Sequence, residues 1–258
     1  MKRIVLYILL GIGILSCTKV PITNRKQTNL MKETTLIEMS KKQYAEFLST
    51  ANVLPDSDPR AQRVLRVGNR IKEATESFLK RKGYAKRLEG FEWEFKTVDD
   101  DIVNAWCMPG GKVCVFTAIL KLCETDDELA VVLGHEIAHA IARHGNERMS
   151  NQMVVNGVGQ VLSPQDPNQV SIFQQVFMGT ATLGMLKYGR SHESEADKLG
   201  LVFMKIAGYN PEAAIGFWEK MASTGGQKPP EIFSTHPSDE RRIRDIKEFL
   251  TEIDAYIR

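Results

Sequence analysis

The apolar and polar positions of this chain follow a helical period over several long stretches. Apolar residues recur at the three- and four-residue spacing of an amphipathic helix over residues 61–82, 211–221 and 238–257. A shorter stretch, residues 91–98, alternates between apolar and polar positions as a half-buried strand does. The pattern predicts a mainly helical domain that contains a small amount of sheet.

The clearest helical stretch lies near the middle of the chain. Thr125 and Glu128 have the spacing of a capping box, which predicts that a helix begins there. Gly145 is the expected end of this helix. No proline interrupts the stretch between these ends, and Gly134 is its one weak helix former.

Residues 135–139 of this predicted helix read His-Glu-Ile-Ala-His. Because a helix turns by about 100° per residue, His135 and His139 project from one face and can reach one ion. Glu136 lies beside them and becomes the candidate general base for a zinc-bound water. Two ordinary histidines of an amphipathic helix are the alternative, so a third ligand has to decide between these interpretations.

A catalytic zinc usually has three protein ligands and keeps a fourth position for water. Residues 190–200 form a second predicted helical segment, on which Glu193 and Asp197 share a face. One carboxylate can bind zinc while the other accepts a hydrogen bond from the outer nitrogen of a ligand histidine. The small residues Ala196 and Gly200 would let this segment approach the first helix closely.

Two further residues compete for these roles. Glu195 is an alternative ligand that spacing alone does not exclude. His144 fits better as a solvated histidine near a helix end, where the helix dipole favours positive charge. The whole segment could also be the charged, solvent-facing start of an ordinary helix.

Three motifs in this order resemble those of the HtpX and CAAX-prenyl-protease family of zinc metallopeptidases. They are the run at 135–139, the Glu-Ser-Glu-Ala-Asp run at 193–197, and Thr-His-Pro at 235–237 with Arg242. The resemblance extends from about residue 20 to the C-terminus. Within the family it points to the stand-alone periplasmic lipoproteins of the BepA and LoiP type.

The resemblance implies an α+β fold, a mainly helical zincin domain of the gluzincin type with a small antiparallel sheet beside the active-site helix. It implies one zinc ion per chain and a zinc metalloendopeptidase activity. It also implies roles for individual residues, with His135, His139 and Glu193 as zinc ligands, Glu136 as the catalytic base, and Asp197 and Arg242 as supporting residues.

The resemblance further implies that His236 faces the metal. This histidine would be either a switchable fourth ligand that closes the resting enzyme or a hydrogen-bond donor to the developing oxyanion. An ordinary turn histidine that precedes a proline is the alternative.

Asn104 and Ala105 lie in an extended segment that borders the zinc cleft in the resembling family. A hairpin turning at residues 109–112 follows them. An exposed strand edge can hold a peptide through main-chain hydrogen bonds, which predicts a substrate-binding role for these two residues. An ordinary hairpin that closes a small sheet is compatible with the same sequence.

The segment between the two metal-binding helices, residues 146–189, is expected to be an interrupted helical insertion over the cleft. Residues 176–186 are apolar but too short to cross a bilayer, which needs about 20 apolar residues.

The N-terminus has the pattern of a secretory signal. Lys2 and Arg3 precede an apolar run at residues 4–15, and the four residues 14–17 resemble a lipobox ending at Cys17. The resemblance implies lipidation of Cys17 and a lipid-anchored protein of the bacterial cell envelope, on the outer membrane facing the periplasm. A plain secretory signal with an incidental Cys17 is the alternative. The expected division of the chain is a signal peptide (1–16), a lipidated tether with a first helix (17–50) and a peptidase domain (51–258).

Three further cysteines, Cys107, Cys114 and Cys123, leave one unpaired thiol at least. Cys107 and Cys114 flank the predicted turn, so a cross-strand disulfide between them is possible. Packing as small apolar residues is the favoured interpretation.

Composition fits one globular domain, with 258 residues of which 43% are hydrophobic and 26% charged. A net charge of +2 spread along the chain does not suggest nucleic-acid binding. We therefore expect a zinc-dependent endopeptidase that acts on unfolded or misassembled envelope polypeptides in protein quality control. A non-catalytic lipoprotein, stabilised by zinc and acting as a chaperone or assembly factor, is the alternative. A zinc-buffering protein is disfavoured because the chain has no His-rich tract, and the sequence sets no oligomeric state.

Overall fold

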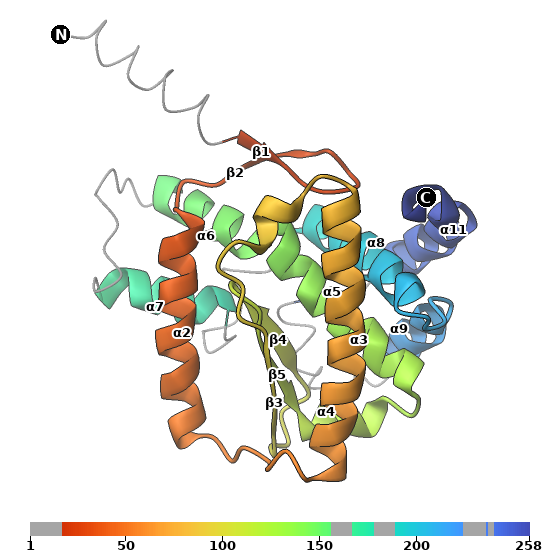
Figure 1. The fold of residues 1–258 in the computed structure, drawn as a ribbon, viewed down its shortest axis with the longest axis horizontal. Helices are drawn as coiled ribbons and strands as arrows, with labels where there is room; N and C mark the ends of the chain where they lie inside the picture. The colour runs from red at the N-terminus through yellow and green to blue at the C-terminus, as the bar shows by residue number, and fades with distance from the viewer. Residues whose placement is uncertain (1–16, 156–166, 178–188, 224–235, 237–239) are drawn as a thin grey trace, which may run out of the picture.

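The computed structural model of this chain (Figure 1) describes residues 17–155, 167–177, 189–223, 236 and 240–258. The expected signal peptide, and residues 235 and 237 of the Thr-His-Pro motif, lie outside these residues. The mainly helical architecture with a small sheet is the one that the sequence predicts.

The long helices form where the apolar period is strongest. α3 (Pro59–Arg81), α9 (Ala213–Ser223) and α11 (Glu240–Ile257) agree with the three amphipathic stretches to within a few residues. α3 begins at a cap in which the Asp58 side chain accepts a hydrogen bond from the Arg60 N–H at 2.8 Å. The other helices outside the site are α2 (Glu33–Thr50), α4 (Thr117–Leu122) and the 3₁₀ turn η1 (Ala85–Leu88).

A three-stranded sheet lies between α2 and α3 in the view of Figure 1. Its order is β3 (Glu94–Val98), β5 (Lys112–Phe116) and β4 (Ala105–Met108). β4 and β5 form the expected antiparallel hairpin, and Gly110 and Gly111 both take positive φ angles in its turn. The prediction of a purely antiparallel sheet is wrong, because the hairpin inserts β5 beside β3 and these two strands run parallel.

The hairpin register separates the two cysteines that flank the turn. Cys107 lies opposite Val113, and Cys114 lies opposite Trp106. Cys107 packs into the core around α5, whereas Cys114 packs into the second core on the other face of the sheet. The cysteines at 107, 114 and 123 are free and buried, as the packing interpretation predicts.

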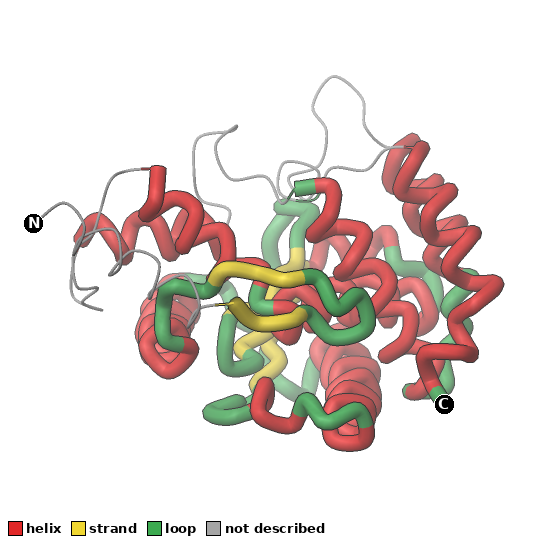
Figure 2. The backbone as a smooth tube through the Cα atoms, turned by 90° about the horizontal axis from the view of Figure 1, so that it is seen from above, coloured by secondary structure: helices red, strands yellow, loops and turns green. Residues whose placement is uncertain are grey.

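A second, two-stranded sheet lies near the N-terminus of the described chain. β1 (Cys17–Lys19) and β2 (Lys26–Thr28) pair antiparallel, and Figure 2 shows this hairpin lying across the helical body. Gln27 Nε2 donates to the Ala142 carbonyl at 2.8 Å, and Val20 is fully buried in the main core. The hairpin therefore shares its core with the rest of the domain.

Two helices occupy the segment for which a helical insertion is expected. They are α6 (His144–Val155) and α7 (Pro167–Phe177), which pack on each other. α6 also contacts β2, and α7 contacts β4 and α2. Most of the apolar stretch 176–186 falls outside the described residues. Among the described residues, no helix has the length and apolar character needed to cross a membrane.

Candidate metal centre

Two helices carry the centre. α5 (Asp126–Ala142) begins with the predicted capping box, in which Thr125 and Glu128 each accept a hydrogen bond from the other's backbone N–H. α8 (Arg190–Ile206) contains the second motif. These two helices make the most extensive helix–helix contact in the described structure.

The end of α5 differs from the sequence-based prediction. Arg143 takes a left-handed conformation with φ 61° and ends the helix, and α6 starts at the next residue. Gly145 is therefore not the stop but lies inside α6. A Cβ atom at Gly145 would stand 2.1 Å from the Phe177 ring, so a larger residue at this position would have to displace that ring.

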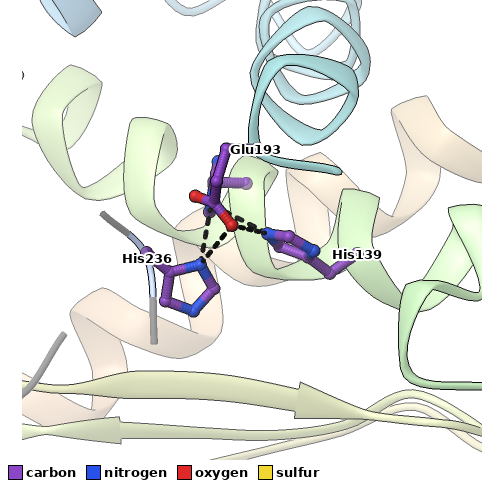
Figure 3. Close-up of side chains that lie close together, drawn as sticks. His139, Glu193 and His236 are labelled. Atoms are coloured by element: carbon purple, nitrogen blue, oxygen red, sulfur yellow. Dashed lines mark hydrogen bonds and ion pairs between the residues drawn. The ribbon is translucent and has the colours of Figure 1, made fainter. Parts of the chain in front are cut away.

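Four buried side chains from three parts of the chain bring their donor atoms together. His135 and His139 come from α5, Glu193 from α8, and His236 from the segment before α11. One ligand atom of each lies within 4.8 Å of those of the others. Figure 3 shows His139, Glu193 and His236 pointing toward one another.

The spacing of these atoms fits a metal ion. His135 Nε2 lies 3.0 Å from His139 Nε2 and 3.2 Å from His236 Nδ1. The carboxylate oxygens of Glu193 lie 3.2 to 3.4 Å from the three imidazoles. Ligand atoms at zinc–ligand distances in a tetrahedral site are about 3.3 to 3.6 Å apart. The cluster also offers three imidazole nitrogens and one carboxylate, which are donor types that zinc binds.

The surroundings of the site favour an ionised Glu193 and a neutral His139. Burial opposes the charge of Glu193, but His236 and Arg242 outweigh it and hold the pKa of this carboxyl well below its ordinary value. Burial lowers the pKa of His139 well below its ordinary value. A neutral imidazole and a carboxylate are the protonation states that bind metal.

The outer nitrogen of His135 contacts the residue expected to support it. Asp197 Oδ1 lies 3.0 Å from His135 Nδ1. Arg242 donates to both oxygens of Asp197, at 2.5 and 2.7 Å, and its Nη1 lies 3.1 Å from Glu193 Oε2. The Arg242 guanidinium also stacks on the Trp218 ring at 3.8 Å. This arrangement fixes the orientation of His135 and positions Glu193.

Glu136 lies next to the donor cluster without joining it. Its side chain is 3% exposed, and Oε1 accepts no hydrogen bond. His236 Nε2 lies 3.6 Å from Glu136 Oε1. Burial raises the pKa of Glu136 to about 7, the range suited to a general base at neutral pH.

Glu195 and His144 are placed differently from the sequence-based expectations. Glu195 is absent from the donor cluster and instead contacts His144, with Oε2 at 3.2 Å from Nε2. His144 is fully buried rather than solvated, and its Nδ1 lies 2.8 Å from His139 Nδ1. Burial lowers the pKa of His144 to about 4 despite the pull of Glu195, so this ring is neutral at physiological pH.

Sequence reasoning missed two neighbours of this pair. His192 stacks on His144 with ring centroids 4.4 Å apart and contacts Glu147. Arg25, in the loop of the N-terminal hairpin, donates to both Glu147 and Glu195. No local pattern marks Arg25, because its partners are more than 100 residues away in the sequence.

The strand expected to bind substrate lies at an edge of the sheet next to α5. Asn104 O accepts from Phe116 N at 3.2 Å, so the alternation of an antiparallel ladder directs the main chain of Ala105 and Cys107 away from β5. The Ala105 N–H donates to Asn104 Oδ1 at 2.9 Å. Asn104 and Ala105 are both buried.

A helix carrying two metal-directed histidines, a carboxylate from a second helix and a buried glutamate beside the donor atoms define a metallopeptidase domain. Comparison with known proteins specifies this class further. The model of Peptidase family M48 matches residues 66–250, and the chain belongs to this family.

Similar proteins occur in bacteria and in mitochondria. Mitochondrial metalloendopeptidase OMA1 of Schizosaccharomyces pombe is 34% identical over 238 residues, which cover 90% of this chain and 66% of the relative. The Beta-barrel assembly-enhancing protease of Escherichia coli K12 is 29% identical over 165 residues, which cover 60% of this chain and 34% of the relative. Human mitochondrial OMA1 is 27% identical over 247 residues, which cover 90% of this chain and 45% of the relative.

The chain spans between 34% and 66% of the length of these relatives. The matches establish the family and do not separate the HtpX and prenyl-protease subgroup from its other members.

Proposed function

We propose that this protein is a zinc-dependent metalloendopeptidase of the bacterial cell envelope. The observation that carries the proposal is the buried donor cluster with Glu136 beside it. A site that only stabilises the fold needs its ligands but not an additional buried carboxylate, and Oε1 of Glu136 has no hydrogen-bond partner among the described residues. Glu136 therefore favours the enzyme over a non-catalytic, zinc-stabilised chaperone or assembly factor.

The proposed mechanism uses the residues as the geometry places them. His135, His139 and Glu193 would hold the ion, with Asp197 and Arg242 fixing the ligands from behind. When bound, zinc supplies a Lewis acid that polarises a peptide carbonyl and makes water more acidic. Glu136 takes a proton from the attacking water and passes it to the leaving amine.

His236 has two candidate roles, and its position supports one of them. Its Nδ1 lies with the other three donor atoms, 3.2 Å from both His135 Nε2 and Glu193 Oε1. This supports a fourth ligand in the resting enzyme rather than a donor to the oxyanion. His236 would then leave the cluster when substrate enters.

Substrate would bind along β4. The main chain of Ala105 and Cys107 points away from β5, so an extended peptide can add to this edge beside α5. Main-chain recognition accepts many sequences, which suits unfolded or misassembled envelope polypeptides as substrates. Asn104 Oδ1 holds the Ala105 N–H until the peptide replaces it.

The location is proposed from the N-terminus. The signal-like residues 1–16 followed by Cys17 support lipidation at this cysteine and attachment to the outer membrane, facing the periplasm. Similarity to a bacterial protease whose name refers to β-barrel assembly supports a role in outer-membrane protein quality control.

The test compares Glu136→Gln with the wild type in zinc content and in casein hydrolysis. We expect Glu136→Gln to retain one zinc per chain and to lose about a hundredfold to ten-thousandfold in turnover, because only the proton carrier is removed. Glu252→Gln, at an exposed position of α11, is the matched control. Chelator-insensitive hydrolysis, or full turnover by Glu136→Gln, would contradict the proposal.

A further inference from the structure

The outer nitrogen of the second α5 histidine contacts a histidine that the proposed mechanism does not use. His139 directs Nε2 to the donor cluster, at 3.0 Å from His135 Nε2. Its other nitrogen, Nδ1, lies 2.8 Å from His144 Nδ1. The opposite nitrogen of His144, Nε2, lies 3.2 Å from Glu195 Oε2.

The direction of the hydrogen bonds between His139, His144 and Glu195 follows from the form of His139 that binds metal. A histidine that binds metal through Nε2 carries its proton on Nδ1. His139 therefore donates to His144 Nδ1, and His144 must carry its own proton on Nε2. That proton points at the Glu195 carboxylate. The chain of bonds runs from an anion through a neutral imidazole to the imidazole next to the metal.

The residues around Glu195 keep it in place. The Thr23 hydroxyl donates to Oε1 at 2.5 Å, and Arg25 Nε donates to Oε2 at 2.9 Å. The guanidinium of Arg25 also pairs with Glu147, which holds Arg25 beside Glu195. Thr23 and Arg25 therefore hold Glu195 as an oriented acceptor for His144.

We propose that His144 and Glu195 are positioning residues for the metal site, acting through the outer nitrogen of His139. The inference rests on the proposed function and extends it to a second supporting carboxylate. His135 is oriented directly by Asp197, whereas His139 is oriented through an intervening imidazole. The pair fixes the ring plane and the tautomer of His139 and increases the electron density on its Nε2.

The break between α5 and α6 places His144 beside His139. His144 is the first residue of α6 and follows Arg143, whose left-handed conformation ends α5. The sharp turn brings the His144 ring back against His139, five residues earlier in the sequence. On a continuous helix, residues five apart would not face each other.

The test measures the zinc affinity of the whole protein by competition with a chelator, in the absence of substrate. We expect a roughly tenfold loss for Glu195→Gln and a loss of ten- to a hundredfold for His144→Ala, the range seen when outer hydrogen-bond partners of metal ligands are removed. Glu195→Gln keeps the shape of the side chain, so this variant retains the packing of the site.

Glu33→Gln is the matched control, because Glu33 pairs with Arg143 at 3.3 Å and accepts a hydrogen bond from Asn146 at 3.1 Å, at the same helix junction. Unfolding of the metal-free variants in urea reports purely structural damage. The inference holds if zinc affinity falls for Glu195→Gln and His144→Ala and stays within about twofold of wild type for Glu33→Gln. It is overturned if the first two variants bind zinc as the wild type does, or if all three lose affinity equally.

The result is independent of the proposed activity. A protein whose zinc affinity depends on His144 and Glu195 but that cleaves no polypeptide would refute the protease alone. A protein that cleaves casein through Glu136, with zinc affinity unchanged in both variants, would refute the positioning role alone.

Discussion

Gly200 of α8 lies so close to Gly134 of α5 that a Cβ atom on Gly200 would stand 2.9 Å from the Gly134 carbonyl carbon. A Cβ atom on Gly134 would likewise stand 3.0 Å from the Gly200 carbonyl oxygen. Both obstacles are backbone atoms, which cannot rotate away. The contact sets the distance between the helix that carries His135 and the helix that carries Glu193.

Gly200→Ala is therefore expected to force the two helices apart. Overpacking of this kind costs about 1 to 3 kcal/mol in the free energy of unfolding, although alanine is the better helix former. The wider spacing should also weaken zinc binding, because Glu193 would move relative to the histidines. Urea unfolding and chelator competition measure the two effects.

Gly216→Ala is the matched control for this substitution. Gly216 lies in α9, and a Cβ atom there would meet nothing within 4 Å. This change should stabilise the protein by about 0.4 to 1 kcal/mol and leave zinc affinity unchanged. A Gly200→Ala protein as stable as the Gly216→Ala protein would show that the helix contact is not limiting.

Ala105→Pro tests the proposed substrate strand. The Ala105 main chain faces away from β5, so proline leaves the ladder with β5 intact and removes the N–H from the side where a peptide would add. We expect a lower kcat/KM on casein with unchanged zinc content. Ala105→Ser keeps the N–H and should cleave as the wild type does. Equal turnover by a folded, zinc-loaded Ala105→Pro protein would remove β4 from the binding site.

Glu147 provides a test of pH dependence. Burial opposes its charge, but hydrogen bonds from Arg25 and His192 hold its pKa far below the ordinary value of 4.5. Because the folded-state pKa is lowered, the ionised carboxylate stabilises the fold above about pH 4.5. This stabilisation is lost as the pH falls below that value, when the unfolded chain takes up the proton more readily.

The variant Glu147→Gln should therefore be less stable than the wild type at pH 7, by about 2 kcal/mol. The difference should shrink steadily between about pH 5 and pH 3, where the wild type loses this contribution and the variant has none to lose. Urea unfolding of the two proteins at four pH values gives the comparison. A difference that is constant with pH would show that the Glu147 charge does not stabilise the fold.

Local sequence was sufficient to predict the helices and part of the site. The spacing of His135 and His139 and the capping box at Thr125 are properties of one helix, so the polar and apolar pattern contains them. The end of α5 was misplaced by two residues, because no sequence pattern shows that Arg143 takes a left-handed conformation.

Spacing alone could not decide which side chains of distant segments meet, although the family resemblance implied Glu193 as the ligand. Glu193 and Glu195 lie two residues apart on α8, so the rotation of that helix decides which of them reaches the metal cluster. The contact at Gly200 helps to fix this rotation, and it directs Glu193 to His139 and Glu195 to His144. The parallel pairing of β3 with β5 is also a tertiary property, because it depends on where the hairpin docks.

All five histidines of the chain lie together around the metal centre. The chain contains five histidines, and His135, His139, His144, His192 and His236 form one continuous series of ring contacts. Isotope labelling restricted to histidine would therefore yield a nuclear magnetic resonance spectrum whose imidazole signals all originate in or beside the catalytic centre. The occupancy and tautomers of that centre could be followed without background from the other 253 residues.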